Sequence, residues 1–512
     1  MLLVAGAVVR FLFLARKPFW FDECFSVEVA RMNLGNFLHL LWWREANMSL
    51  YYLLLRVWLR LEPPKGQSEF FIRSLSVLIA VAAIPAIYWL AWQLYDRRVA
   101  LIAAGLLTFN AYSVRYSQEA RSYALFLLLA TLSSGFLIAF LRAPTRRNRI
   151  GYVLVSILAV YAHFYAFLLL VTHWMALRRL RSGARSFDQS TQPCPPLAKQ
   201  IRRVWITIGL AVLPLLIFVA KTGAGPIRWI QRPGLRDVLE FYSELAGGSN
   251  WGLLTLYVVA CIAAVASARR RLSGDGETED QKGTTNWEPW RSQFLLLWLL
   301  FPVALTVLLS FARPVFLSRY MIFCLPPLLI FAAAGLARLR PSWLLSAVLA
   351  GIWLLGSEGI FFVYTHDFDN ERDASVSAAN FILDHAQPGD AVVFHIAGTR
   401  IPYEFVRSLR TGENTASPDF GDQHFTDQLG PQILFPYHGA SLDYRDFTGK
   451  PTADFLRTIA SSHPRVWIML MNNGPADNPD PTTVMLTQIL PESFPKILRW
   501  QFTRVEVRLY SK

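Results

Sequence analysis

The stretch SYALFLLLATLSSGFLIAFL (residues 122–141), followed at once by RAPTRRNR (142–149), decides the class of this chain. The first part carries no charge and matches the roughly 20 residues of α-helix that cross a bilayer. A basic cluster directly after such a run is typical of a cytoplasmic loop. The sequence therefore predicts a transmembrane helix that ends in the cytoplasm near residue 142.

The same pairing of apolar run and basic cluster recurs along the 512 residues, of which 54% are hydrophobic and only 17% charged. About eleven apolar spans are expected. They lie near 1–15, 74–94, 99–113, 122–141, 150–162, 164–177, 204–221, 251–268, 293–311, 321–337 and 342–363. If the first span starts in the cytoplasm, the cytoplasmic loops hold about 20 lysines and arginines. Membrane topology therefore explains the net charge of +14, and no nucleic-acid partner is expected.

The composition becomes that of a soluble domain past about residue 364. ERDASVSAANFILDH (371–385) has helical spacing, while AVVFHIAG (391–398), RVWIMLMN (465–472) and TRVEVRLY (503–510) are typical of strands. We therefore expect a polytopic α-helical membrane domain over 1–363, with a long outer loop at 16–73. A small extracytoplasmic α/β domain should follow over 364–512, in a protein of the cytoplasmic (inner) membrane.

Two adjacent carboxylates, Asp22 and Glu23, lie in WFDECFS (20–26), just outside the first span. Partial burial among aromatic residues would raise the pKa of such a carboxylate toward the range of a general base. The alternative is a helix N-terminus with acidic residues placed at its positive dipole end. The residues alone favour neither interpretation.

Two arginines are expected at the outer ends of spans, Arg121 in RYSQEARSY (115–123) and Arg319 in LSRYMIF (317–323), where Tyr320 follows. Arginine binds phosphate bidentately, so an anionic lipid head group is one explanation. On the residues alone, a salt bridge between Arg121 and Glu119, or snorkelling to the interface, is the commoner role. His163 lies in a tight outer turn (VYAHFYAF, 160–167), where a lone histidine is more often structural.

Other chemistries receive little support from the sequence. No HExxH, GxSxG, P-loop or GxGxxG pattern occurs in a convincing context, which argues against conventional hydrolases, ATPases and nucleotide-cofactor enzymes. The four cysteines have no metal-ligand spacing. We expect no cofactor.

Several separated motifs together resemble a known family. WFDECFSVEVAR (20–31), REANMSLYYLLLR (44–56), SEFFIRSLSVL (68–78), YSQEARSYAL (116–125) and SRYMIFCLPPLL (318–329) occur in order. This pattern resembles the bacterial family 39-type glycosyltransferases of the GT-C superfamily, which are related to protein O-mannosyltransferases and the lipid A aminoarabinose transferase. The similarity covers about residues 10–340, and ERDASVSAANFI followed by PGDAVVF resembles the start of the family's soluble tail.

The resemblance implies a membrane enzyme that transfers a sugar from a polyprenyl-phosphate donor, with inversion, to an acceptor on the outer face. The acceptor can be lipid, polysaccharide or protein. The family's acid pair falls on Asp22, the expected base, and Glu23. Its donor-phosphate arginines fall on Arg121 and Arg319, with Glu119 as a second acid.

One departure from the family pattern concerns the position of a His-Pro-Pro or Lys-Pro-Pro. This chain has Asn47-Met48-Ser49 there, which makes Asn47 a further site candidate. The three acids Asp22, Glu23 and Glu119 could together hold Mg²⁺ or Mn²⁺. Family relatives work without a metal, so none is expected.

Two rival functions fit parts of the pattern. A flippase or transporter for lipid-linked sugars would use the arginines as phosphate ligands, but it leaves Asp22-Glu23 unexplained, since transporters place ionisable residues nearer the bilayer midplane. A non-catalytic scaffold would use the outer domain to bind a partner.

Overall fold

The computed structural model describes residues 1–43, 45–61, 68–185, 195–222, 230, 232–248, 250–272, 287–366, 372–411, 430–435, 450–471 and 480–512. The chain forms two compact units. Unit 1 comprises residues 1–12, 47–51 and 73–365, and unit 2 comprises residues 13–46, 52–72 and 366–512.

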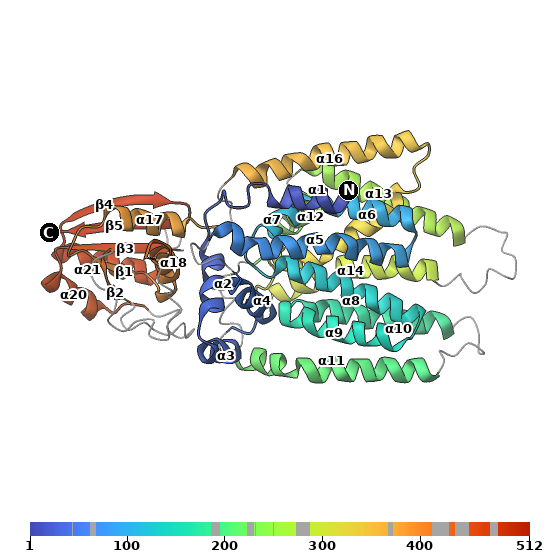
Figure 1. Cartoon of the computed structure of the whole chain (residues 1–512), viewed down its shortest axis with the longest axis horizontal. Coiled ribbons are helices and arrows are strands. Elements are labelled where there is room, and N and C mark those ends of the chain that lie inside the picture. The colour runs from blue at the N-terminus through green and yellow to red at the C-terminus, as the bar shows by residue number, and fades with distance from the viewer. Residues whose placement is uncertain are drawn as a thin grey trace. The chain divides into compact units, whose positions relative to one another are not determined.

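Unit 1 is helical throughout its described residues (Figure 1). Its helices are α1 (Leu2–Phe11), most of α5 (Glu69–Leu94), α6 (Arg97–Thr108), α7 (Ala111–Ser117), α8 (Tyr123–Arg142), α9 (Arg146–Ala162), α10 (Ala166–Arg185), α11 (Pro195–Thr222), α12 (Leu235–Ala246), α13 (Trp251–Leu272), α14 (Trp287–Ser310), the 3₁₀ helix η3 (Ser318–Cys324), α15 (Leu325–Leu336) and α16 (Ser342–Thr365).

The helices of unit 1 make this a multi-pass membrane protein. Within the described ranges, six helices are long and apolar enough to cross a membrane, or up to eight if each of two bent helix pairs forms one span. Each expected span overlaps helical residues, although the span 99–113 covers both α6 and α7, which meet at a bend of 57°. The expected break near His163 is confirmed, since α9 ends at Ala162 and α10 begins at Ala166. The number of helices that cross the bilayer stays a prediction.

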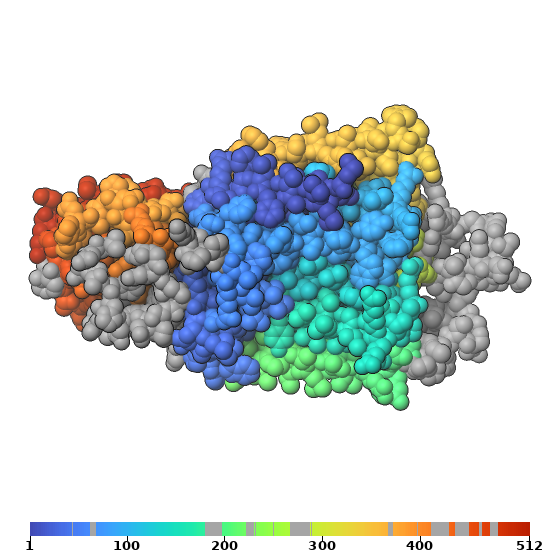
Figure 2. All heavy atoms as spheres, in the orientation of Figure 1, coloured from blue at the N-terminus to red at the C-terminus, as the bar shows by residue number. Residues whose placement is uncertain are grey.

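Packing within unit 1 differs strongly from helix to helix. The apolar segment Ser318–Leu336 is 94% buried, whereas α11 and α16 are only 28% and 11% buried. Helices α11 and α16 lie at opposite edges of the unit (Figures 1 and 2), so their apolar surfaces are available to lipid. Helix α15 approaches α13 so closely that a Cβ on Gly335 would lie 1.9 Å from the carbonyl oxygen of Ala260.

Unit 2 combines the first outer loop with the C-terminal tail. The loop supplies α2 (Phe21–Arg31), α3 (Leu34–Trp43) and most of α4 (Ser49–Leu59). Helix α2 packs on α18 (Arg400–Thr411) of the tail. Phe19 and Phe405 stack at 5.2 Å, and the Arg31 guanidinium lies over the Phe405 ring. The outer loop and the tail therefore share one packed core.

The tail forms a five-stranded sheet in the order β2-β1-β3-β5-β4. Strands β1 (Ala391–Phe394), β2 (Gln432–Phe435) and β3 (Arg465–Met471) are parallel, while β4 (Lys496–Phe502) and β5 (Val505–Ser511) form an antiparallel hairpin beside β3. Helices α20 (Ala453–Ser462) and α21 (Pro481–Ser493) cover one face, and α17 (Ser375–His385) packs through Phe381 on Trp467 and Trp500 of the other. Figure 1 shows this layered arrangement.

The expected α/β tail is confirmed, with two differences in detail. The helix expected from residue 371 begins at Ser375, and residue 371 itself lies outside the described residues. Strands β2 and β4 were not anticipated. The burial of β4 alternates between exposed and partly exposed residues, so its sequence KILRWQF lacks the continuous apolar run of a central strand.

The contact at Gly335 predicts a strong effect of a small substitution. Gly335→Ala should destabilise the protein by about 1–3 kcal/mol, because the new methyl group must push apart the backbones of two packed helices. The midpoint of thermal unfolding of the full-length protein in detergent measures this. Gly209→Ala in α11 is the control, since nothing lies within 4 Å of its Cβ position. Equal midpoints for the two variants would contradict the prediction.

Candidate functional site

The turn between α9 and α10 brings together several of the expected site residues of unit 1. Asn47 accepts a hydrogen bond through Oδ1 from the backbone N–H of Phe164 at 3.1 Å. Ser49 donates through Oγ to the carbonyl of Tyr161 at 3.2 Å. The segment that carries Asn47 is therefore fixed on the two sides of His163, at the position where the family pattern has a different triplet.

His163 is fully buried in an aromatic surround. Its ring stacks on Phe126 at 5.0 Å and lies 4.9 Å from Tyr320 and 5.4 Å from Tyr165. The Nδ1 atom of His163 accepts from the backbone N–H of Tyr165 at 3.2 Å, which places the proton of a neutral ring on Nε2. Within the described residues this buried Nε2 has no hydrogen-bond partner.

Arg121 and Arg319 both act electrostatically on His163. Arg121 lies just before α8, and Arg319 lies in η3 with its guanidinium 5.8 Å from the centre of the Tyr320 ring. Burial of the ring, followed by repulsion from the two cations, lowers the pKa of His163, which lies in a turn outside the membrane-spanning helices. The site thus combines two cations and a neutral imidazole, a set that suits an anion.

The two arginines are themselves buried, at 7% and 5% exposure, and Glu119 is 2% exposed. Snorkelling would require the guanidinium groups to reach water, so this burial disfavours it. The backbone N–H of Arg121 donates to the carbonyl of Glu119 at 2.8 Å, which forms the tight turn ahead of α8. The sequence-predicted residues Arg121, Arg319, Tyr320 and His163 therefore belong to one neighbourhood of unit 1.

Asp22 and Glu23 occupy the first turn of α2 in unit 2. The helix-terminus interpretation is therefore correct as a description of local structure, since acids in a first turn are stabilised by the helix dipole. It does not exclude a catalytic role. Asp22 is partly exposed, whereas Glu23 is completely buried.

The tail supplies two residues that contact the start of α2, and the sequence analysis identified neither of them. Arg372 donates to Glu23 through a 3.1 Å ion pair in which both side chains are buried. Asp373 accepts from the backbone N–H of Phe21 at 3.3 Å. Burial raises the pKa of Asp373, and the negative charge of Asp22 raises it further. Hydrogen bonds from Ser375 and from the backbone of Phe21 oppose this rise. The signal that could have identified both residues is the acidic-basic-acidic triplet at 371–373.

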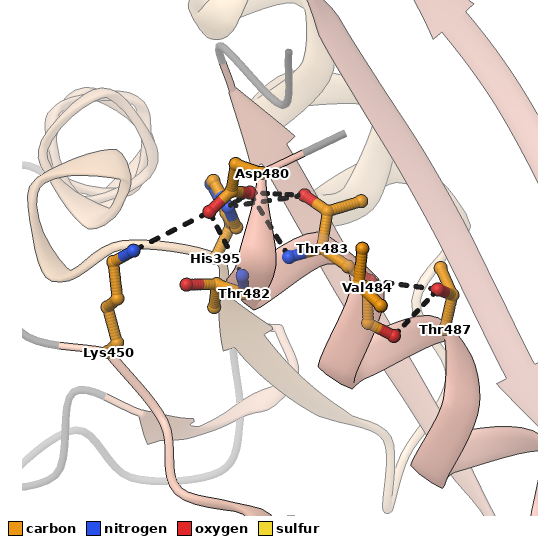
Figure 3. A network of polar contacts seen from close by, with 7 residues as sticks. All are labelled: His395, Lys450, Asp480, Thr482, Thr483, Val484 and Thr487. Carbon is orange, nitrogen blue, oxygen red and sulfur yellow. Dashed lines mark hydrogen bonds and ion pairs between the residues drawn. The ribbon is translucent and has the colours of Figure 1, made fainter. Parts of the chain in front are cut away.

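A second polar network in unit 2 lies where strands β1 and β3 end (Figure 3). His395 directly follows β1, and its Nε2 lies 2.5 Å from Asp480, the N-cap of α21. Thr483 donates through Oγ1 to Asp480 at 2.6 Å, and Lys450 lies 3.5 Å from the same carboxylate. Since β1 leads to β2 on one side and β3 leads to the hairpin on the other, the network occupies a topological switch point of the sheet.

Opposing effects act on the two titrating groups of this network. Burial lowers the pKa of His395 and outweighs the attraction of Asp480, while Lys450 lowers it further. Burial opposes ionisation of Asp480. Hydrogen bonds from Thr483 and Thr482, together with the charge of His395, nevertheless hold the pKa of Asp480 well below its usual range.

Groups of three or more His, Cys, Asp or Glu that could hold a metal do not occur among the described residues. The expectation of a metal-free site stays a prediction.

Comparison with known proteins gives structural neighbours only. No family model matches the chain, and no curated protein does. The structure of ArnT from Cupriavidus metallidurans in the apo state aligns over 99% of this chain and 97% of its own, with 12% identity and a TM-score of 0.61. The same values hold for ArnT bound to undecaprenyl phosphate.

Archaeal oligosaccharyltransferase structures are also similar. AglB from Archaeoglobus fulgidus, in complex with an inhibitory peptide and a dolichol-phosphate, aligns over 91% of this chain and 69% of its own, with 10% identity and a TM-score of 0.52. The A. fulgidus oligosaccharyltransferase in complex with Zn and sulfate aligns over 98% of this chain and 73% of its own, with 11% identity and a TM-score of 0.56. This chain therefore has the same overall fold as these structures.

The Glu23–Arg372 pair yields a prediction about stability. Glu23→Gln should destabilise unit 2 by about 3–5 kcal/mol, because it removes the negative charge of a buried ion pair. Limited proteolysis of the full-length protein, with cleavage sites mapped by mass spectrometry, measures the exposure of residues 13–46 and 372–411. Glu240→Gln is the control, since the Arg236–Glu240 pair is solvent-exposed and should be dispensable. Matching digestion rates would rule out a structural role for the buried pair.

The His395–Asp480 network predicts acid sensitivity. Folded His395 takes up a proton less readily than the same residue in the unfolded chain. The free energy of unfolding should therefore keep its full value above the unfolded pKa of about 6.5 and decrease as the pH falls below it. Asp480, with a lowered pKa, adds a further loss only below about pH 4. Unfolding midpoints from pH 8 to pH 5 should decrease less steeply in His395→Asn than in the unchanged protein. The control His385→Asn, at an exposed helix end, should keep the pH dependence of the unchanged protein. The same pH dependence in His395→Asn would contradict the assignment of acid sensitivity to His395.

Proposed function

We propose that this protein is an integral membrane glycosyltransferase that takes a sugar from a polyprenyl-phosphate carrier. The sugar passes, with inversion at its anomeric carbon, to a lipid, polysaccharide or protein acceptor on the outer face of the cytoplasmic membrane. The observation that carries this proposal is the buried set Arg121, Arg319 and His163 in unit 1, which offers cations and an imidazole N–H to an anion.

The burial of the two arginines favours a phosphate ligand over a role at the surface. A guanidinium removed from water is costly unless an anion or hydrogen-bond acceptors compensate it. A lipid phosphate provides oxygens that match the planar arginine fork. The ligands of the structural neighbours support the same class of donor, since one ArnT structure contains undecaprenyl phosphate and one AglB structure contains a dolichol-phosphate.

The proposed reaction is a direct displacement at the anomeric carbon. The acceptor hydroxyl oxygen forms a bond to this carbon while the bond to the phosphate oxygen breaks, and the polyprenyl phosphate leaves with the electron pair. Asp22 accepts the hydroxyl proton as general base, which typically contributes about 10²–10⁴-fold in rate. Arg121 and Arg319 stabilise the negative charge that develops on the leaving phosphate.

The remaining candidates take supporting roles in this proposal. Glu23 and its partner Arg372 hold the first turn of α2, so that Asp22 keeps its orientation. Asn47 holds the backbone beside His163. Convergence of Asp22 with the two arginines on one donor is part of the proposal, as is the assignment of residues 1–363 to the catalytic membrane domain and 364–512 to an extracytoplasmic domain.

Replacement of the base and of the arginines should have different consequences. Asp22→Asn should reduce transfer by at least about 100-fold while donor binding is retained. Arg121→Ala and Arg319→Ala should weaken the binding of undecaprenyl phosphate. Mass spectrometry of glycolipids and glycoproteins from a deletion strain that carries each variant measures transfer. Binding of undecaprenyl phosphate to each purified variant measures the affinity for the donor lipid.

Arg146→Ala is the matched control, since it removes one exposed cation at the start of α9. Unchanged transfer by Asp22→Asn would reject the catalytic role and leave a flippase, which transport of lipid-linked sugar into vesicles would detect. Full transfer by both arginine variants would instead reject their role in binding the donor phosphate.

A further inference from the structure

A cavity of about 920 Å³ lies between α10 and α11 of unit 1, away from the proposed donor site. Its lining contains the cations Arg178, Lys199 and Arg202, and the described residues that line it include no acid. Within the described parts of the chain, no carboxylate forms a salt bridge with any of these three side chains. The cavity therefore has a positive charge that an anionic ligand would neutralise.

Two tryptophans give the cavity an amphipathic wall. The Arg178 guanidinium stacks on Trp174 at 4.1 Å, one helical turn earlier in α10. In α11, Trp205 lies three residues after Arg202, on the same side of the helix. Tryptophan rings are typical of the membrane interface, and a cation beyond them lies at head-group level. Each of the two helices thus contributes a tryptophan and an arginine to the lining.

The apolar part of the cavity lining continues from the level of the two tryptophan rings along the membrane-facing surface. Leu177, Ile201 and Ile206 belong to the lining, and Ile206 is 54% exposed. Helix α11 is only 28% buried over its apolar length. A ligand with an anionic head and hydrocarbon chains could therefore place its head among the cations and its chains along α11.

We propose that this cavity binds the phosphate head group of an anionic membrane phospholipid. A free inorganic phosphate would use the cations but not the tryptophans or the apolar wall, so a lipid is the occupant that the whole lining fits. The basic ends of α10 and α11 are those expected in the cytoplasm. This site is separate from the proposed catalysis, and its presence or absence does not bear on the transferase proposal.

Native mass spectrometry of the full-length protein in detergent, titrated with dioleoyl phosphatidylglycerol or dioleoyl phosphatidylethanolamine, tests the proposal. We expect preferential binding of phosphatidylglycerol, and about 10- to 30-fold weaker binding in the double variant Arg178→Ala/Arg202→Ala, since each cation near the surface contributes a several-fold effect. Arg178→Lys/Arg202→Lys keeps the charge and should retain most of the affinity.

The control is Arg146→Ala/Arg147→Ala, which removes two exposed cations from the start of α9. An equal loss of affinity in this control would overturn the site, because only net charge would then matter. Equal binding of the two lipids by the unchanged protein would overturn the anionic preference. Displacement of bound phosphatidylglycerol by excess inorganic phosphate would show that the cavity selects a free anion instead of a lipid.

Discussion

The cost of burying charge among apolar helices is the constraint on which the proposed site depends. Unit 1 is built from helices apolar enough to cross a membrane, and yet it buries Arg121, Arg319 and Glu119 together with His163. A charge removed from water must be compensated by an opposite charge or by several hydrogen bonds. Burial, followed by repulsion from the two cations, lowers the pKa of His163, and an uncharged imidazole limits the total positive charge. The proposed lipid phosphate would add an anion to this buried set.

The acidic residues Asp22 and Glu23 depend on contacts from outside their own helix. Helix α2 is short and lies in a loop between membrane helices, so its own hydrogen bonds could not keep it in place. The tail fixes it from outside through Arg372, Asp373 and the stacked Phe405 ring. The first outer loop and the C-terminal tail are therefore one physical unit, although residues 73–365 separate them in sequence. We infer that the tail is required for the geometry of Asp22, independently of any acceptor that it binds.

The apolar helices and the strands of the tail differed in how completely the sequence predicted them. The apolar centres of the membrane helices, and the turn at His163, were predicted because hydrophobic length and charged breaks are local properties. Central strands β1 and β3 were also predicted, since each is a continuous apolar run. The edge strands β2 and β4 were missed, because their side chains are mostly half-exposed and only pairing with a neighbour makes them strands.

The sequence by itself determined the class of the protein, the positions of its helices and the residue types able to bind a lipid phosphate. Only the tertiary structure decided which distant groups meet. Glu23 pairs with Arg372, and His395 reaches Asp480, contacts that no local pattern encodes. The physical reason is that periodicity and propensity act over a few residues. The burial and charge of a site instead depend on elements brought together from the whole chain.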